Sequence, residues 1–396
     1  MARFSTRAIL AATRTPEVGQ TPSAVPIYQA AAFSTADADE LGDVLTGAKS
    51  GYAYSRIDNP TTAALASAIA ELESAEAGLA FATGMAAIHA AVVSVVRAGQ
   101  TIVATQALYG TTRDLLVRIL SGLGVATVFV DPTDHAAVDA ALGSTGSPLL
   151  YVETVSNPTI IVSDISALAT IAHRHGARLL VDNTFASPFG CRPIEHGADL
   201  VMHSATKYLS GHADVLAGVV VGKREFVDAC RPILVDIGGA LAPLAAFLVL
   251  RGLPTLELRM RRHSETALEL AVWLQGRDGV ERVHYPGLPS NLQHELASRQ
   301  LDVFGGMLAF ELSGGRAAGR AFLDAMTIAE RTASLGAFRT ITSHPASTTH
   351  RQLDAEALAA GGIAPGLLRC SVGLEDVEDL REDFERGLAA ATAFPA

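Results

Sequence analysis

Cysteine is scarce in this sequence. The 396 residues include only three cysteines, Cys191, Cys230 and Cys370, and they lie far apart. Their odd number and wide spacing argue against a disulfide framework, and they form no CxxC or other metal-binding spacing. We therefore expect reduced thiols, a cytoplasmic protein and no metal site.

Long hydrophobic runs are also lacking. The longest apolar stretch, from Ile237 to Leu250, contains Gly-Gly and a proline and is too short to cross a bilayer. Residues 1–7 lack the apolar segment typical of a signal peptide. Basic residues are in the minority, with 30 Lys and Arg against 41 Asp and Glu, and the net charge is −11. This balance disfavours nucleic acid or a membrane surface as a partner.

The remaining composition is typical of a compact α/β protein. Apolar residues make up 49% of the chain, which is long enough for one large and one smaller domain. Strand-like segments at 101–105, 126–130, 149–153, 178–182, 198–202 and 218–221 alternate with helical segments at 61–74, 85–96 and 165–175. Strand–helix alternation of this kind predicts a mostly parallel, doubly wound sheet.

Three regions follow from the pattern along the chain. Residues 1–55 look extended and loop-rich, and residues 56–244 contain the expected sheet. A helical stretch from Leu244 to Leu274 comes next, followed by short strand-like segments within 283–374. We expect residues 245–396 to form a smaller α+β domain.

The most informative run is His203-Ser-Ala-Thr-Lys207-Tyr-Leu-Ser-Gly-His212. Because residues 198–202 resemble a buried strand, Lys207 falls in the loop at its carboxyl end, where open α/β sheets bind ligands. A partly desolvated lysine at such an edge can have a pKa low enough for it to act as a nucleophilic amine. The alternative, an ordinary surface lysine, is the commoner case for this residue type in isolation.

A second candidate site residue, Asp182, lies 25 residues before Lys207. Residues 178–182 read as a central parallel strand that ends in this carboxylate. A buried carboxylate needs a cationic partner. Pyridoxal phosphate (PLP) has a ring nitrogen that an acid keeps protonated and an aldehyde that a lysine holds, so Asp182 and Lys207 together indicate PLP.

A third motif supplies an anion site. Thr83 and Gly84 stand at the expected start of an alanine-rich helix, where free backbone N–H groups and the positive helix end attract a phosphate. A Thr-Gly pair in this position is more often only a helix cap. In company with Lys207 and Asp182, we favour the phosphate-binding interpretation.

With these residues in hand, the chain resembles the Cys/Met-metabolism (trans-sulfuration) family of fold-type-I PLP-dependent enzymes. The resemblance covers nearly the whole chain. It rests on motifs that occur in the family's order: Tyr54-Ser-Arg56-x-x-Asn59-Pro, Ala82-Thr-Gly-Met-Ala-Ala-Ile88, Leu108-Tyr109-Gly, Glu153-Thr-Val-Ser-Asn157-Pro, Val181-Asp-Asn-Thr-Phe185, Ser204-Ala-Thr-Lys207-Tyr, Ser334-Leu-Gly, His344-Pro-Ala-Ser-Thr-Thr-His350 and Leu368-Arg369-Cys-Ser-Val-Gly.

The resemblance implies a role for each of these positions. Lys207 would carry the cofactor covalently and move protons, and Asp182 would pair with the ring nitrogen. Tyr109 would stack on the ring and assist the leaving group. The residues implied to hold the phosphate are Gly84, Met85, Ser204 and Thr206, together with Tyr54 and Arg56 from a neighbouring subunit. The residues implied to bind substrate are Asn157, Ser334, Arg369 and Arg339.

The resemblance also implies assembly and chemistry. The N-terminal segment would reach a neighbouring subunit, so we expect a homo-oligomer built from dimers that share their active sites, and a tetramer of such dimers. The substrate would be an amino acid, with sulfide or a thiol as the second reactant. The expected reaction is loss of a γ-substituent, followed either by addition of sulfur or by release of a 2-oxo acid and ammonia.

Two branches of the family fit the sequence. Relatives of the lyase branch carry glutamate where this chain has Arg339, and methionine γ-lyases carry cysteine where it has Thr111. These differences favour an O-acylhomoserine sulfhydrylase. Other segments, such as the run from Tyr285 to His294, are closer to the lyases. A C–S γ-lyase acting on methionine or cystathionine therefore stays as the alternative.

Readings from other classes fit less well. Ser204-Ala-Thr-Lys207 matches the Ser-x-x-Lys motif of β-lactamases, but the Ser-Asp-Asn and Lys-Thr-Gly motifs of that class are absent. A metal enzyme would need His173, His175, His203 or His212 to converge, and His173 and His175 are two residues apart on an expected helix, so they point in different directions. A PLP-binding protein without activity is a further alternative.

Overall fold

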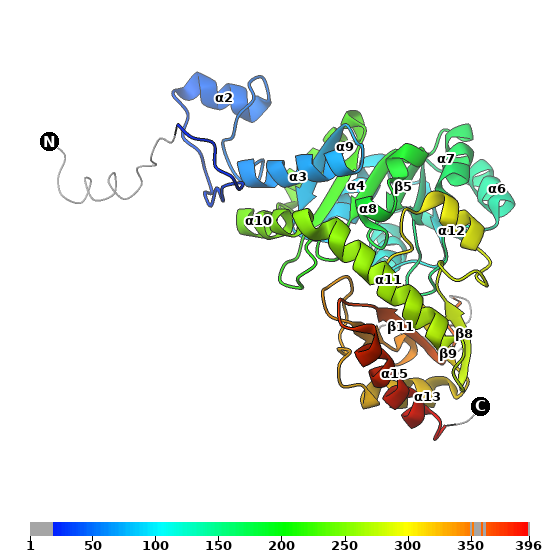
Figure 1. Cartoon of the computed structure of the whole chain (residues 1–396). Coiled ribbons are helices and arrows are strands. Elements are labelled where there is room, and N and C mark those ends of the chain that lie inside the picture. Colours follow the sequence, from blue (N-terminus) through cyan, green and yellow to red (C-terminus); the bar gives the residue numbers. More distant parts are fainter. Residues whose placement is uncertain (1–18, 349–350, 352–357, 359–361, 395–396) are drawn as a thin grey trace.

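The computed structural model describes residues 19–348, 351, 358 and 362–394 (Figure 1). It has a seven-stranded sheet and a separate four-stranded sheet. The long helix α11 (Leu256–Leu274) runs from the part of the molecule that holds the large sheet toward the small one (Figure 1). The fold is α/β, as the sequence predicts.

The large sheet has the strand order β1-β7-β6-β5-β4-β2-β3. Its central pairings, β6 with β5, β5 with β4, β4 with β2 and β2 with β3, are parallel, whereas β7 is antiparallel to both of its neighbours. The strand bounds are β1 Ala77–Phe81, β2 Thr101–Thr105, β3 Ala126–Val130, β4 Leu149–Glu153, β5 Arg178–Asp182, β6 Leu200–His203 and β7 Gly218–Gly222. The prediction of a mostly parallel sheet is confirmed.

Helices cover both faces of this sheet because alternate strand residues face opposite ways. On β5, Leu179 and Val181 belong to one core cluster and Leu180 to the other. The helices of this part are α3 Pro60–Leu72, α4 Gly84–Val95, α5 Gly110–Asp114 with its π-helical continuation Leu115–Leu120, α6 His135–Thr145, α7 Ile165–Arg174, α8 Ser187–Gly190 and α9 Arg224–Ile237. The doubly wound arrangement follows from this two-sided burial.

The small sheet is antiparallel, with the order β10-β11-β9-β8. The aromatic rings of Phe310, Phe322 and Phe384 pack together between β9 and two helices. The bounds here are β8 Val280–His284, β9 Met307–Leu312, β10 Ile341–Ser343, β11 Leu367–Ser371, α12 His294–Gln300, α13 Gly315–Ala325 and α15 Val377–Ala391. A sheet covered by α13 and α15 matches the expected α+β part.

Three details differ from the sequence prediction. β1 was not predicted, since its sequence Ala-Gly-Leu-Ala-Phe is poor in the β-branched residues that favour strands. β10, which has only three residues, was not predicted either. The helical stretch from Leu244 to Leu274 is broken into α10 (Pro243–Gly252), a 3₁₀ turn and α11, because Pro254 cannot continue an α-helix.

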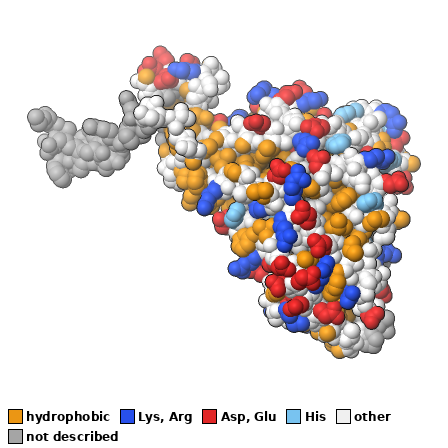
Figure 2. All heavy atoms as spheres, in the orientation of Figure 1, with side chains coloured by type: hydrophobic (Ala, Val, Ile, Leu, Met, Phe, Trp, Pro, Cys, Tyr) orange, Lys and Arg blue, Asp and Glu red, His pale blue; other side chains and the backbone are white. Residues whose placement is uncertain are grey.

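The domain boundaries at 55/56 and 244/245 stay predictions. Near the N-terminus the described chain forms α2 (Ala38–Thr46), which stands apart from the sheets (Figure 1). On the face shown in Figure 2, hydrophobic side chains gather near α3 and α10, while acidic and basic side chains are mixed across the middle. Within the described residues, no helix is both long and apolar enough to cross a membrane.

Candidate active site

Ten of the predicted site residues line one cavity of about 250 Å³. It lies at the carboxyl ends of β4, β5 and β6, the edge at which parallel sheets bind ligands. These residues are Gly84, Met85, Tyr109, Asn157, Asp182, Ser204, Thr206, Lys207, Ser334 and Arg369. Positions up to 285 residues apart in sequence, from Gly84 to Arg369, therefore face the same space.

Lys207 follows β6 and is largely buried. Its Nζ donates a hydrogen bond of 3.0 Å to Ser334 Oγ. Burial, and after it the positive charge of Arg369, lowers the pKa of Lys207 to about 8. A lowered pKa leaves a useful fraction of the amine neutral near neutral pH, as a nucleophile requires.

Asp182 ends β5 and is 9% exposed. One carboxylate oxygen accepts the N–H of Thr184 at 3.0 Å, and the other accepts the hydroxyl of Tyr151 at 3.4 Å. Burial raises the pKa of Asp182. Since no lysine or arginine pairs with Asp182 in the described part of the chain, its carboxylate suits a cationic group such as a protonated ring nitrogen.

The start of α4 packs directly on the loop that carries Lys207. A Cβ atom added to Gly84 would lie 2.9 Å from Ser204 Cβ and 3.0 Å from Ser204 Oγ, so only glycine fits there. Thr83 caps the helix by accepting the N–H of Ala86 at 3.0 Å. The N–H groups of Gly84 and Met85 thus lie at a helix N-terminus, and the hydroxyl residues Ser204 and Thr206 line the same cavity. This arrangement is suited to binding a phosphate.

Arg369, on β11, is 7% exposed. Its Nη1 donates to Asn157 Oδ1 at 2.9 Å and its Nη2 to the Ser334 carbonyl at 3.1 Å. Its buried Nε has no partner among the described residues. A buried guanidinium held only by neutral oxygens is suited to an anionic ligand such as an α-carboxylate.

These observations fit PLP. The cavity offers a lysine with a lowered pKa, a buried carboxylate without a cation, a helix-terminal anion cradle and a buried guanidinium. Tyr109, which lines the same cavity, is 45% exposed and presents its aromatic side chain there. No group of His, Cys, Asp and Glu in the described ranges could hold a metal ion.

Two residues around this site, Glu153 and Thr184, were not predicted as site residues from the sequence. Glu153, at the end of β4, also lines the cavity and accepts the backbone N–H of Tyr109 at 2.7 Å and of Asn157 at 2.9 Å. Thr184 Oγ1 accepts the N–H of Ser204 at 2.9 Å, which ties β5 to the Lys207 loop. Glu153 had a signal in the sequence, since it begins the motif Glu153-Thr-Val-Ser-Asn157-Pro, but its contact with Tyr109 spans 44 residues.

A buried, hydrogen-bonded pair of side chains, Glu73 and His203, lies beside the cavity. Glu73 Oε1 accepts from His203 Nε2 at 2.6 Å and from Asn183 Nδ2 at 2.7 Å. His203 directly precedes Ser204, and Asn183 directly follows Asp182. Glu73 therefore fixes the ends of two neighbouring strands that carry site residues.

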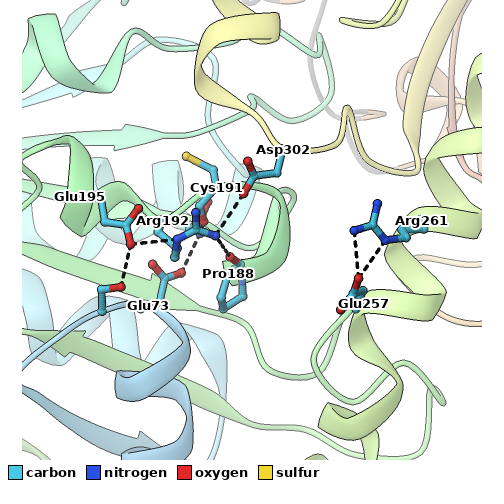
Figure 3. A network of polar contacts seen from close by, with 10 residues as sticks. Glu73, Pro188, Cys191, Arg192, Glu195, Glu257, Arg261 and Asp302 are labelled. Carbon is cyan, nitrogen blue, oxygen red and sulfur yellow. Dashed lines mark hydrogen bonds and ion pairs between the residues drawn. The ribbon is translucent and has the colours of Figure 1, made fainter.

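Arg192 makes a second connection nearby, shown in Figure 3. It donates to Glu195 at 3.0 Å, to the Pro188 carbonyl at 3.2 Å and to Asp302 at 3.1 Å. This arginine links the segment after β5 to the loop that leads into β9.

The histidines considered for a metal site do not converge. His173 contacts Asp199 at 2.9 Å, and His175 contacts Asp139 at 2.6 Å. His203 faces Glu73, and His212 Nδ1 contacts the Ser210 carbonyl at 2.6 Å. Each of these histidines has a different partner, which removes the geometric basis of a shared metal site for them.

Tyr54, Arg56 and Arg339 lie outside the Lys207 cavity of their own chain. Tyr54 is 44% exposed, and the Arg56 guanidinium lies 5.5 Å from its ring and donates to the Val235 carbonyl. Arg56 lines a different cavity of about 500 Å³ between α3 and α9. This arrangement separates both residues from Lys207 within one subunit.

Arg339 lies in a neighbouring open cavity of about 510 Å³. Its guanidinium pairs with Glu330 and lies 5.6 Å from the ring of Phe338. This cavity shares Thr206, Leu216 and Ser334 with the Lys207 cavity. Arg339 is therefore adjacent to the site and does not line it.

The motif His344-Pro-Ala-Ser-Thr-Thr-His350 is only partly covered by the structure, because Thr349 and His350 lie outside the described residues.

The chain was compared with known proteins. The family described as "Cys/Met metabolism PLP-dependent enzyme" matches residues 5–389. An L-methionine γ-lyase of Pseudomonas deceptionensis is 45% identical over 368 residues, 92% of each chain. An O-succinylhomoserine sulfhydrylase of Pseudomonas aeruginosa is 41% identical over 389 residues, 98% of this chain and 96% of the relative.

A solved structure extends the likeness to the fold and the cofactor. A putative O-acetylhomoserine (thiol)-lyase of Campylobacter jejuni, crystallised with pyridoxyl-lysine monophosphate, is 30% identical, with a TM-score of 0.89 over 95% of this chain and 97% of that one. The family and the cofactor predicted from the sequence are thereby confirmed. This chain belongs to the Cys/Met-metabolism family of fold-type-I enzymes, whose cofactor is PLP.

Proposed function

We propose that this enzyme is an O-acylhomoserine sulfhydrylase, which replaces the γ-acyloxy group of its substrate with sulfur. Membership of the family supports the coarser statement, PLP-dependent γ-replacement or γ-elimination on amino acids of methionine and cysteine metabolism. The choice of replacement on an activated homoserine is the proposal.

The roles of the cavity residues follow from their positions. Bound PLP supplies an electron sink that makes the α-proton of an amino acid acidic. Arg369, oriented by Asn157 and Ser334, would bind the α-carboxylate, and Lys207 Nζ would then move the α- and β-protons. Tyr109 would lie against the ring and assist departure of the γ-substituent.

The observation that carries the sulfhydrylase proposal is the position of Arg339. Its side chain is 60% exposed, so its ion pair with Glu330 is weak, worth under ~1 kcal/mol, and the guanidinium remains open to an anion. The cavity that it lines adjoins the Lys207 cavity at Ser334. A cation there favours a distal carboxylate, as in O-succinylhomoserine, or an anionic sulfur nucleophile, and disfavours the distal ammonium of cystathionine.

The second candidate is a C–S γ-lyase. It is supported by relatives named L-methionine γ-lyase, which reach 45% identity over most of the chain. In a lyase, water would complete the reaction in place of sulfide and release a 2-oxo acid, ammonia and a thiol. Thr111, in place of the cysteine of methionine γ-lyases, weighs against this candidate.

We also propose that the active unit is a dimer. Tyr54 and Arg56 stand away from the Lys207 cavity of their own chain, and a neighbouring subunit would bring them to its phosphate cradle. Exposed apolar residues such as Leu244 on α10, 52% exposed, support further contacts between subunits and hence a tetramer.

The test is a substrate panel with the purified holoenzyme. O-succinylhomoserine, O-acetylhomoserine, methionine and cystathionine are each incubated with and without sulfide, and homocysteine and 2-oxobutanoate are measured. The proposal expects homocysteine from an O-acylhomoserine with sulfide as the fastest reaction. Faster release of 2-oxobutanoate from methionine or cystathionine would favour the lyase instead.

Arg339→Glu tests the specificity argument. It should change the ratio of kcat/KM between O-succinylhomoserine and cystathionine by ~10-fold or more, about 1.4 kcal/mol. Arg261→Glu is the matched control, because Arg261 is a similarly exposed arginine in an ion pair with Glu257 on α11 and lines neither cavity. An equal response of both substrates to Arg339→Glu would leave Arg339 without a role in specificity.

A further inference from the structure

Glu153 occupies an unusual position for a carboxylate. It ends β4 directly beside Asp182 on β5, its partner in the parallel ladder. It is 5% exposed and lines the Lys207 cavity. Burial, and then the charge of Asp182, raises the pKa of Glu153. Two acidic groups side by side in a buried site are costly, so the presence of Glu153 calls for a physical reason.

Its two oxygens hold two different segments. Oε1 accepts the N–H of Tyr109 at 2.7 Å, and Oε2 accepts the N–H of Asn157 at 2.9 Å. Tyr109 precedes α5 and has no side-chain cap of its own for that helix. Glu153 is therefore the group that fixes the backbone at the start of α5 relative to the turn after β4.

Each segment carries a group that faces the cavity. The Tyr109 side chain lines the cavity, and Asn157 Oδ1 accepts from Arg369 Nη1 at 2.9 Å. A continuous set of hydrogen bonds thus runs from Tyr109 through Glu153 and Asn157 to the guanidinium of Arg369. A shift of the Glu153 carboxyl group would therefore move both Tyr109 and the Arg369 guanidinium.

We infer that Glu153 is a positioning residue that holds the Tyr109 ring and the Asn157–Arg369 pair in one geometry around Lys207. The inference rests on the roles proposed for Tyr109 at the ring and for Arg369 in substrate binding, and it holds for either a sulfhydrylase or a lyase. The carboxyl group of Glu153 accepts a backbone N–H through each of its two oxygens, whereas the carboxamide of glutamine accepts through one oxygen and turns its NH₂ toward the other backbone N–H. Glutamine at position 153 therefore accepts the backbone N–H of one segment, Tyr109 or Asn157, and repels the N–H of the other.

The experiment measures binding without turnover. Holoenzyme is titrated with L-norvaline, which has an α-carboxylate but no γ leaving group, and the change in the visible absorbance of the bound cofactor gives Kd. Glu153→Gln should raise this Kd by ~10-fold or more, since one hydrogen bond to a carboxylate is lost and the Arg369 fork is misaligned. The absorbance maximum without norvaline should also shift, because the Tyr109 ring moves.

Asp383→Asn is the matched control. Asp383 is fully buried and accepts backbone N–H groups of Thr327, Ile328 and Ala329, but it lies away from the cavity. Its substitution should lower the melting temperature and leave both the Kd of norvaline and the absorbance maximum unchanged. Should Glu153→Gln fail to fold, Glu153→Asp replaces it, since the shorter side chain cannot reach both N–H groups and should weaken binding in the same direction.

A double-mutant cycle separates positioning from a general loss of structure. Glu153→Gln combined with Asn157→Ala should bind norvaline about as weakly as Asn157→Ala alone, because the two residues act through the same contact with Arg369. Additive losses, or a Kd for Glu153→Gln that matches the Asp383→Asn control, would overturn the inference. A wild-type enzyme that makes no homocysteine would overturn only the sulfhydrylase proposal, whereas an unchanged Kd in Arg369→Lys would overturn the role of Arg369, on which the inference rests.

Discussion

Lys207 Nζ donates a hydrogen bond of 3.0 Å to Oγ of Ser334, which lies 127 residues further along the chain. Lys207 follows β6 of the large sheet, and Ser334 precedes β10 of the small sheet. The Ser334 carbonyl also accepts from Arg369 on β11. The reactive amine and the proposed carboxylate-binding guanidinium therefore depend on how the two sheets are held together.

The rate at which the cofactor-free protein reacts with added PLP should depend on pH with a midpoint near 8. Burial and then the charge of Arg369 disfavour the protonated amine and lower the pKa of Lys207 to about 8. The neutral amine is the nucleophile, so the rate should rise as pH rises through this value and level off above it. Absorbance after rapid mixing follows the reaction. A rate that still climbs steeply at about pH 10 would contradict a lowered pKa.

Two substitutions of Arg369 should separate its charge from its shape. Arg369→Gln removes the positive charge that lowers the pKa of Lys207, so the midpoint of cofactor attachment should move to higher pH. Arg369→Lys keeps the charge and should keep the midpoint near 8, while it weakens binding of amino acids by ~10-fold or more because the planar fork is lost. Identical midpoints and affinities in the two variants would argue against both roles.

Much of the large sheet could be predicted from the sequence because its strands are short apolar runs between helical segments. β2, β3, β4 and β5 have the predicted bounds, and Asp182 ends β5 as predicted. Lys207 lies in the loop after β6, which begins two residues later than predicted. β1 could not be predicted in this way, because its alanines and glycine carry no β preference and it is a strand only through pairing with β7.

Removal of Glu73 should destabilise the fold. Glu73→Ala would leave His203 and Asn183 buried without their acceptor, and the free energy of unfolding should fall by about 2–6 kcal/mol, since each unsatisfied donor costs about 1–3 kcal/mol. Denaturant titration measures this change. Glu257→Ala is the control, since Glu257 and Arg261 form an exposed pair worth under ~1 kcal/mol. Similar losses in both variants would show that the buried pair contributes little.

The contacts of Glu73 and Glu153 could not be read from the sequence for a different reason. Glu73 meets His203 across 130 residues, and Glu153 holds the backbone N–H of Tyr109 across 44. Such pairs depend on tertiary arrangement, and a backbone donor leaves no mark in side-chain patterns. For Arg339, the motif predicted a site residue, but the sequence could not predict that it pairs with Glu330 in the adjacent cavity.

Subunit sharing should appear in a mixing experiment. Arg56→Ala and Lys207→Ala proteins, each inactive alone, are unfolded together and refolded so that hybrids form. A hybrid dimer has one site with both native residues, so roughly a quarter of wild-type activity should return. Hybrids that form, as native mass spectrometry can show, and yet stay inactive would rule out a contribution of Arg56 to the neighbouring site.

The most direct test of the account is the identity of the lysine that holds PLP. The chain has three lysines, Lys49, Lys207 and Lys223, and the side chains of Lys49 and Lys223 are 54% and 56% exposed. Borohydride reduction of the holoenzyme followed by peptide mass spectrometry should find the pyridoxyl phosphate group on Lys207, and a Lys207→Ala variant should carry none and lose nearly all turnover. Modification of Lys49 or Lys223 in the active enzyme, or sustained γ-chemistry in Lys207→Ala, would contradict the account.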